Sequence, residues 1–250
     1  GSSGYPCAET YRGPSAASEP EVQAIVNYAK TIFPINQRKS NPESQLGVAY
    51  PDSAIGVFID FHSYGETMIW PWGFQNVLSP NEVGFGALVN KYKSFNGYAY
   101  SGPNNGFSYP ASGASDDWAY GTLGAAAMTF ELGTDFYQPC TYFSSSIVPK
   151  SIRALNYAAK ISGAPYSLPK GPDVIKILFD AASVNSTGVL KVRPTASDSA
   201  WSPGKFATSK QGVASIRAWV DVHPYDSGAG TGEVVSGVSL TSDPTTGLYA

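Results

Sequence analysis

The sequence predicts an α/β protein over its longer first part and an all-β module after it. Up to about residue 163, amphipathic helix patterns alternate with short apolar strand patterns, which is typical of a sheet covered by helices. Beyond that point the patterns are strand-like only, and turns rich in Pro, Gly, Ser and Asp separate them. We therefore expect an α/β domain over residues 1–168 and an Ig-like β sandwich, whole or partial, over residues 169–250.

The amino-acid composition argues against a nucleic-acid partner and a membrane span, and it favours an extracellular location. Apolar residues make up 42% of the 250, which is enough for a core, and charged residues make up 14%, against about 25% in average proteins. The net charge is −3 and no basic stripe is present, so we expect no nucleic-acid partner. No apolar run approaches the roughly 20 residues of a membrane span. With 16 Tyr and 26 Gly, the surface draws its polarity from hydroxyl and amide groups, which favours an extracellular (secreted) protein.

Three segments of the first domain have helix patterns. Ser18 and Ser79 are each followed by Glu three residues later, the spacing of a capping box, and both predict a helix start. The second of these helices extends to about residue 95. A third helix is predicted over residues 146–162, with a short helical turn over residues 116–120.

Three apolar runs are predicted to form the sheet of the first domain. They are Ile55–Phe61, Thr67–Trp70 and Ala125–Leu132. The first run is apolar on both faces except at Asp60, as expected of a strand in a sheet covered by helices. A loop rich in Gly, Ser, Asn and Tyr covers about residues 98–115, and loops of that length are often functional.

The second domain contains four strand-like runs and no helix pattern. Its predicted strands are Val174–Phe179, Val189–Val192, Ser215–Val222 and Glu233–Leu240. The aromatic residues of this part are scattered along the chain, so a carbohydrate-binding β protein stays only a weak third hypothesis for the function.

Two of the apolar runs each deliver one ionisable side chain to the same part of the predicted sheet. His62 follows the first run and Glu131 lies inside the third. A lone buried carboxylate must be paired or have its pKa raised. A histidine at a strand exit with a carboxylate on a neighbouring strand is typical of a metal-and-base site. From the residues alone, a hydrogen-bonded core histidine and a paired structural carboxylate remain open alternatives.

The order of four motifs resembles one family over about residues 1–163. The motifs are Ser18-Glu19-Pro20-Glu21, then His62-Ser63-Tyr64-Gly65 with Trp70-Pro71-Trp72-Gly73, then Tyr109 with Ala111–Tyr120, and finally Thr129-Phe130-Glu131-Leu132. Together they resemble the C-terminal part of the zinc metallocarboxypeptidases of the pancreatic carboxypeptidase A/B type, closest to secreted microbial members. This resemblance implies a mixed sheet covered by helices and a zinc cofactor.

The resemblance also implies roles for single residues. His62 would be a zinc ligand, and Glu131 the general base that takes a proton from the attacking water and returns it to the leaving amine. Tyr109 would close over the substrate's C-terminal carboxylate. Ser63 and Tyr64 would line the cleft, with a cis peptide bond between them.

Asp116 matches the family's position at the floor of the specificity pocket. A carboxylate there implies preference for C-terminal Lys or Arg, because an apolar side chain would leave the buried charge unpaired. The neighbouring Asp117 is a competing candidate for the same position. Without the resemblance, Asp116 reads as a helix N-cap.

The sequence departs from the family pattern at the metal site. It has no His-x-x-Glu motif, and its second histidine, His223, falls in the predicted β module. We therefore expect a companion segment or chain to supply the remaining zinc ligands and the rest of the sheet. The pairing of Cys7 and Cys140 stays open, and Asn185-Ser186-Thr187 is a glycosylation sequon.

Two hypotheses for the function follow from these features. The first is an extracellular zinc-dependent exopeptidase that removes C-terminal residues, with Lys or Arg preferred, from peptides and proteins. The second is a catalytically inactive, carboxypeptidase-derived structural or binding component of an extracellular multi-chain assembly. Zinc bound at His62 would favour the first hypothesis, and a site without metal would favour the second.

Overall fold

A computed structural model describes residues 3–33, 37–38, 45–101, 110–179 and 192–198, with 212–213, 216–218 and 233–234. The described residues fall into two compact units that divide after Leu168. Among them, no helix has both the length and the apolar character needed to cross a membrane.

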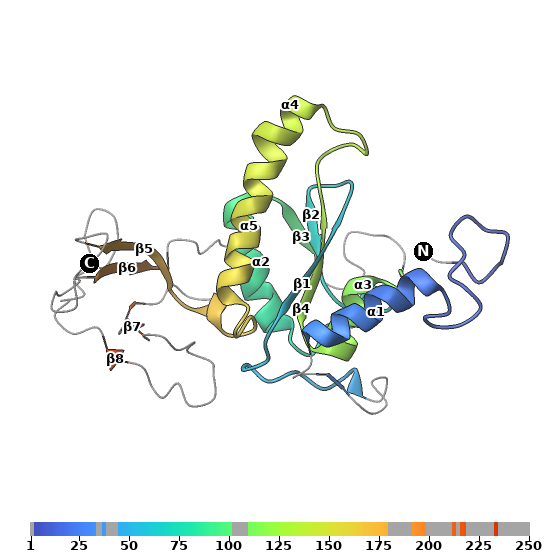
Figure 1. The fold of residues 1–250 in the computed structure, drawn as a ribbon, viewed down its shortest axis with the longest axis horizontal. Coiled ribbons are helices and arrows are strands. Elements are labelled where there is room, and N and C mark those ends of the chain that lie inside the picture. The colour runs from blue at the N-terminus through green and yellow to red at the C-terminus, as the bar shows by residue number, and fades with distance from the viewer. Residues whose placement is uncertain are drawn as a thin grey trace. The chain divides into compact units, whose positions relative to one another are not determined.

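The first unit is built on a mixed four-stranded sheet (Figure 1). The strand order is β1-β4-β2-β3, so β1 is an outer strand among those described. β1 pairs parallel with β4, β2 pairs antiparallel with β4, and β2 pairs parallel with β3. The strands are β1 (Val57–His62), β2 (Thr67–Ile69), β3 (Ala99–Ser101) and β4 (Ala126–Glu131). The predicted mixed α/β architecture is therefore confirmed.

The helices of this unit include two long ones that pack against each other beside the sheet, α2 and α5. Gly124, with φ of 74°, caps the η2 turn in the left-handed region just before β4 begins. Its helical elements are α1 (Pro20–Ile32), α2 (Glu82–Asn96), α3 (Ser115–Trp118), η2 (Ala119–Leu123), α4 (Cys140–Tyr142), η3 (Phe143–Ile147) and α5 (Val148–Ile161). A further helical turn, η4 (Leu168–Lys170), begins at the last residue before the division between the units.

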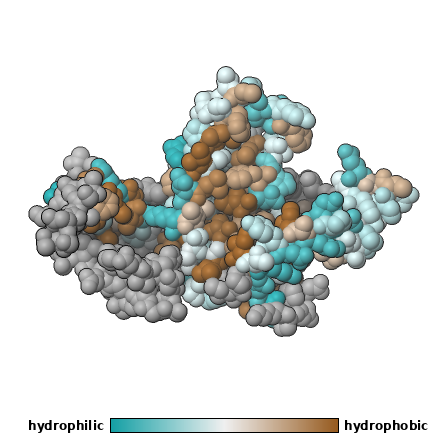
Figure 2. All heavy atoms as spheres, viewed as in Figure 1, coloured by the Kyte–Doolittle hydropathy of each residue, from teal (hydrophilic) through white to brown (hydrophobic). Residues whose placement is uncertain are grey.

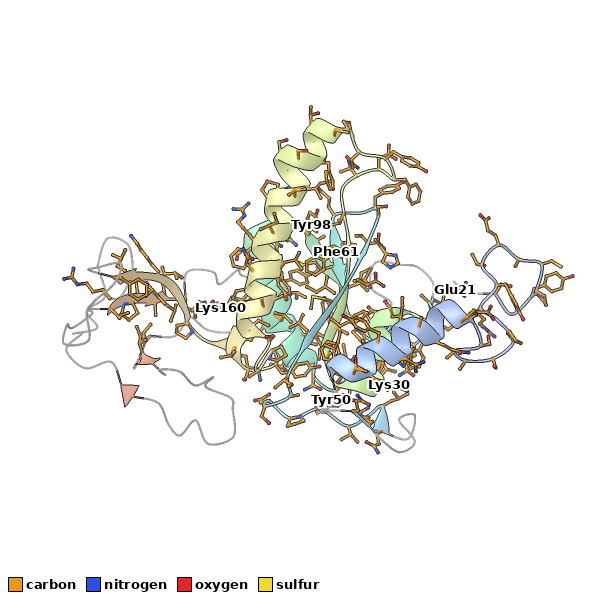
Figure 3. The ribbon with its side chains drawn as sticks, in the orientation of Figure 1. Glu21, Lys30, Tyr50, Phe61, Tyr98 and Lys160 are labelled. Atoms are coloured by element: carbon orange, nitrogen blue, oxygen red, sulfur yellow. The ribbon has the colours of Figure 1, made fainter. Side chains whose placement is uncertain are left out.

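One face of the sheet packs on aromatic side chains of α2 and α5. Phe61 of β1 contacts Phe130 of β4 edge to face, with ring centroids 5.7 Å apart (Figure 3). Phe130 in turn contacts Tyr92 of α2, which contacts Tyr157 of α5. Because side chains alternate along a strand, Asp60 and the residues next to Phe61 and Phe130 face the opposite side. That opposite side carries the ionisable groups.

Both predicted capping boxes are wrong. α1 begins at Pro20 with Glu19 as its N-cap, and the Ser18 hydroxyl donates to the Glu19 carboxylate at 2.8 Å instead of capping the helix. At α2, the Ser79 hydroxyl donates to the Glu82 carboxylate at 3.1 Å, and neither helix has a side-chain cap. The helices begin later than the spacing implies, so each serine finds a carboxylate nearer than the backbone N–H groups.

The apolar side chains of α1 are largely exposed. Ala29 is the buried residue of the helix, whereas Val22, Ile25, Tyr28 and Ile32 are all exposed. In the view of Figure 2, apolar surface also extends along α5, where Ile152 is exposed.

The second unit contains two short antiparallel pairs among its described residues. β5 (Asp173–Phe179) pairs with β6 (Val192–Ser197), and β7 (Arg217–Ala218) pairs with β8 (Glu233–Val234). The predicted strand over residues 189–192 lies outside the described residues except at Val192, where β6 begins. These pairs do not establish a β sandwich.

Candidate active site

The ionisable side chains of β1 and β4 lie next to one another on one face of the sheet. The two strands are parallel and in register, so that His62 pairs with Glu131 and Asp60 pairs with Thr129. Paired residues of neighbouring strands point to the same face. The structure therefore brings together the imidazole and the carboxylate that the sequence analysis selected.

Glu131 is buried, and its environment favours the protonated form. Burial raises the pKa of its carboxyl group, the nearby His62 imidazole lowers it, and Asp60 raises it again. A carboxylate whose pKa is raised toward the working pH is a better proton acceptor than an exposed one. Glu131 is thus placed and tuned as a general base would be.

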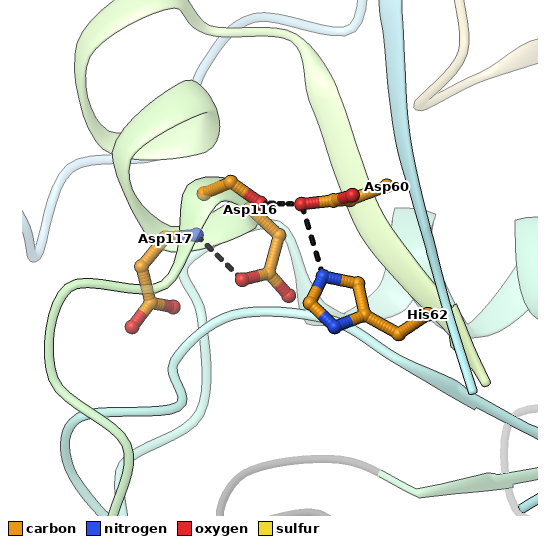
Figure 4. A network of polar contacts seen from close by, with 5 residues as sticks. Asp60, His62, Asp116 and Asp117 are labelled. Carbon is orange, nitrogen blue, oxygen red and sulfur yellow. Dashed lines mark hydrogen bonds and ion pairs between the residues drawn. The ribbon is translucent and has the colours of Figure 1, made fainter. Parts of the chain in front are cut away.

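Asp60 connects His62 to the first turn of α3 (Figure 4). His62 Nε2 lies 3.2 Å from Asp60 Oδ2, and the Ser115 hydroxyl donates to the same oxygen. In the sequence, Asp60 stands out only as a break in an apolar strand. Its position two residues before His62, on the same strand face, was the signal available for this contact.

Asp116 lies in α3 over the same face of the sheet. Its side chain is 4% exposed and accepts hydrogen bonds from its neighbour's backbone N–H and from the Thr129 hydroxyl. Burial, with the adjacent Asp117 carboxylate as the second cause, raises the pKa of Asp116 to about 7. The helix N-cap is Ala114, so the alternative reading of Asp116 as the N-cap is wrong.

Asp117 faces a different part of the structure. Its carboxylate accepts hydrogen bonds from the backbone N–H of Gly73 at 2.9 Å and of Phe74 at 3.1 Å, so it ties α3 to the Trp72-Gly73 turn. Burial raises the pKa of Asp117 to about 6, and these two N–H donors lower it. The two adjacent aspartates therefore have different contacts. Asp117 binds the loop at Gly73 and Phe74, whereas Asp116 faces β4 at Thr129.

We expect the Asp117→Ala variant to lose roughly 2–3 kcal/mol of unfolding free energy, because it leaves the N–H groups of Gly73 and Phe74 without their charged acceptor. Urea unfolding followed by circular dichroism measures the loss. The exposed Asp135, whose carboxylate accepts from its own neighbour's N–H, gives the control substitution Asp135→Ala, expected to stay within about 0.5 kcal/mol. Equal stability of the two variants would contradict this account of Asp117.

The raised pKa of Asp116 predicts a pH-dependent stability. Its ordinary pKa is 3.8 and its folded pKa about 7, so between these values the folded protein retains a proton that the unfolded chain has released. Asp116 then destabilises the fold as pH rises through this window, by at most about 1.4 kcal/mol per pH unit. Unfolding free energies measured from about pH 4 to pH 7 should fall more steeply in the native protein than in Asp116→Asn. Parallel slopes would show that Asp116 titrates normally.

Ser63 and Tyr64 follow His62 at the end of β1. The expected cis peptide bond between them is present, and a second one joins Pro71 and Trp72. The Tyr64 ring is half exposed and packs edge to face on Phe136, with centroids 4.9 Å apart. The Leu132 N–H donates to the His62 carbonyl at 2.8 Å, which extends the pairing of the two strands to their ends.

An open cavity of about 430 Å³ adjoins His62 and Ser63. Sequence reasoning missed its aromatic wall, which comes from the segment after β4. The adjacent aromatic residues Phe136 and Tyr137, in the loop that follows β4, were the signal that could have indicated it. The cavity is lined by Phe61, His62, Ser63, Leu132, Asp135, Phe136, Tyr137, Gln138, Phe143 and Ile147.

Tyr109, Asn185 and His223 lie outside the described residues. Cys7 and Cys140 are both exposed free thiols.

The zinc chemistry fits this face of the sheet only in part. His62 fits a single ligand position, because its second ring nitrogen contacts a carboxylate, as is usual for metal-bound histidines. Across the described residues, however, no three His, Cys, Asp or Glu side chains are grouped to hold a metal ion. These residues do not complete a zinc site by themselves.

Known proteins with similar sequences are carboxypeptidases. Bovine carboxypeptidase B is 34% identical over 137 residues, which cover 53% of this chain and 28% of that protein. Human mast cell carboxypeptidase A is 32% identical, covering 51% of this chain and 27% of that protein. The described fold also aligns with the crystal structure of thrombin-activatable fibrinolysis inhibitor, with a TM-score of 0.48, 23% identity, and coverage of 66% of this chain and 40% of that one.

The chain thus spans under a third of the length of these two carboxypeptidases. A family model described as zinc carboxypeptidase matches residues 1–151, which is more than half of the chain. With the motif order and the paired strands of His62 and Glu131, this match identifies the chain as a member of the zinc carboxypeptidase family.

Proposed function

We propose that this chain carries the general base and one metal ligand of a zinc-dependent carboxypeptidase that removes single residues from peptide C-termini. The observation that carries the proposal is the parallel, in-register pairing of His62 with Glu131. The family implies a zinc cofactor, and His62 would be one of its ligands. When bound, zinc supplies a Lewis acid that polarises the scissile carbonyl and acidifies water.

Glu131 would perform the proton transfers of this reaction. It accepts the proton of the attacking water and then delivers it to the nitrogen of the departing amino acid. Burial supports this role because it raises the pKa of the carboxyl group, and the closeness of His62 supports it because the nucleophile must lie between the two.

Asp116 would select substrates with a C-terminal Lys or Arg. Its carboxylate is buried on the same side of β4 as Glu131, next to Thr129, and an incoming cation would pair with it. Ser63, which lines the cavity beside His62, and the next residue, Tyr64, would contact the substrate chain. Tyr109 would cover the C-terminal carboxylate of the substrate. A substrate with an apolar C-terminal side chain would leave the Asp116 charge buried and unpaired. Because this costs free energy, one buried charge can determine which substrate is preferred.

A companion segment or chain would supply the remaining zinc ligands. Two features of the described residues support this proposal: His62 has no two further ligand side chains grouped with it there, and β1 is an outer strand beside exposed apolar residues. The low content of charged residues supports an extracellular location. Residues 169–250 would then be an appended β-sandwich module that attaches or stabilises the enzyme.

The incomplete ligand set among the described residues also favours a second candidate function. In that case the chain is an inactive, carboxypeptidase-derived component of an extracellular assembly. A metal assay distinguishes the two, since only the enzyme is expected to retain zinc in proportion to its amount.

The exopeptidase proposal is tested with two peptides that end in Lys, one with a free C-terminal carboxylate and one with a C-terminal amide. The protein is prepared with its natural companion, and released lysine is measured by mass spectrometry. We expect release from the free acid alone, and loss of release after zinc chelation. No release from either peptide by zinc-loaded protein would contradict the proposal.

A further inference from the structure

Asp60 is the acidic residue of β1, and its side chain lies on the same strand face as His62. Its Oδ2 atom lies 3.2 Å from His62 Nε2. The same oxygen accepts a hydrogen bond from Ser115, the first residue of α3 (Figure 4). Ser115 therefore fixes the orientation of the carboxylate that meets the imidazole.

The contact between Asp60 and His62 determines which ring nitrogen carries the proton. A carboxylate is an acceptor only, so a neutral imidazole beside it must direct an N–H at it. With the proton on Nε2, the lone pair of Nδ1 is left free. Glu131 is a second acidic group whose charge interacts with the imidazole. By itself it would stabilise a proton on whichever ring nitrogen lies nearer to it.

We propose that Asp60 is a positioning residue that holds His62 as its Nε2–H tautomer and so presents Nδ1 as the metal-binding nitrogen. This inference rests on the proposed function, in which His62 is a zinc ligand. Carboxylate partners of this kind orient metal-bound histidines and set their tautomer. The bond from Ser115 to Asp60 also links the imidazole to α3, the helix that carries Asp116.

The test is a long-range ¹H–¹⁵N NMR spectrum of the full chain at about pH 8.5, which is roughly two units above the ordinary pKa of histidine. The chain has two histidines, so a His223→Gln background leaves His62 as the single imidazole observed. We expect Nε2 to be protonated and Nδ1 to be unprotonated. In Asp60→Ala the tautomer ratio should shift roughly threefold to tenfold toward Nδ1–H, because the charged acceptor beside Nε2 is removed.

Two further variants separate a specific contact from a general effect. Asp135→Ala removes an aspartate from the cavity that His62 lines, and it should leave the tautomer ratio of His62 unchanged. Asp60→Asn keeps an acceptor oxygen and should shift the ratio less than alanine does. Unchanged amide signals of β1 and β4 show that each variant is folded.

The inference is overturned if Nδ1–H is the main tautomer of the native chain, or if folded Asp60→Ala keeps the native ratio. The measurement needs neither zinc nor substrate. An inactive protein with the expected tautomers would therefore contradict the proposed function and leave the role of Asp60 supported.

Discussion

The Glu131→Gln variant is expected to lose about 10²–10⁴-fold in kcat while KM stays within about threefold. Glutamine has almost the same shape as glutamate but cannot accept a proton from water. Substrate contacts by other groups are unaffected, so the loss falls on the chemical step. Steady-state hydrolysis of a peptide ending in Lys, by zinc-loaded protein prepared with the proposed companion, measures both constants.

The matched control for this variant is Glu66→Gln. Glu66 follows His62 closely in the sequence. Its carboxylate accepts a hydrogen bond from the Tyr142 hydroxyl at 3.1 Å, and a glutamine side-chain oxygen can accept the same bond. We expect near-native kcat from this control. A Glu131→Gln protein that keeps its secondary structure and more than about a third of native kcat would show that the carboxylate does not move the proton.

The Asp116→Asn variant is expected to lose about 100-fold in kcat/KM for a peptide ending in Lys, and little for one ending in Phe. Leaving one partner of a buried charge pair alone costs roughly 2–5 kcal/mol, and about 2.7 kcal/mol corresponds to 100-fold. Because its pKa is about 7, preference of the native enzyme for Lys should increase as pH rises through neutrality. The variant should show no such increase.

Asp117→Ala is the discriminating comparison, since Asp117 was the competing candidate for the pocket floor. It should reduce stability through the lost contacts to Gly73 and Phe74 and keep the native Lys-to-Phe ratio. A change of that ratio in Asp117→Ala but not in Asp116→Asn would reverse the assignment.

The position of the candidate site could be predicted from the sequence, because strand patterns constrain geometry strongly. The runs around His62 and Glu131 were long and apolar enough to indicate neighbouring strands, and β1 and β4 are such strands. β4 is buried along most of its length, whereas β1 is only partly buried and is exposed at Phe61 and His62. Parallel pairing in register then places both side chains on one face. The approximate bounds of α5 followed from apolar periodicity.

Contacts between distant polar groups could not be predicted from one sequence. Asp116 and Asp117 are adjacent, and only the packing of α3 against β4 and against the Trp72-Gly73 turn separates their roles. The bond between Ser115 and Asp60 joins residues far apart in the chain and leaves no pattern.

The local sequence signals for helix starts also failed, because a carboxylate accepts the hydrogen bond of each serine hydroxyl that was expected to cap a helix. Ser18 and Ser79 have the capping-box spacing, yet each donates to a carboxylate, so the helix starts differ. The strand pattern after residue 169 indicated strands correctly at β5, but a periodicity of two does not specify how strands assemble into sheets.

Anomalous diffraction at the zinc absorption edge, from crystals of the protein with the proposed companion, would show whether His62 binds zinc. We expect one zinc peak bonded to His62 Nδ1 at about 2.0–2.1 Å, on the side of the sheet that carries Glu131. No peak at His62 in zinc-replete crystals, or a zinc bound entirely by other residues, would contradict the account.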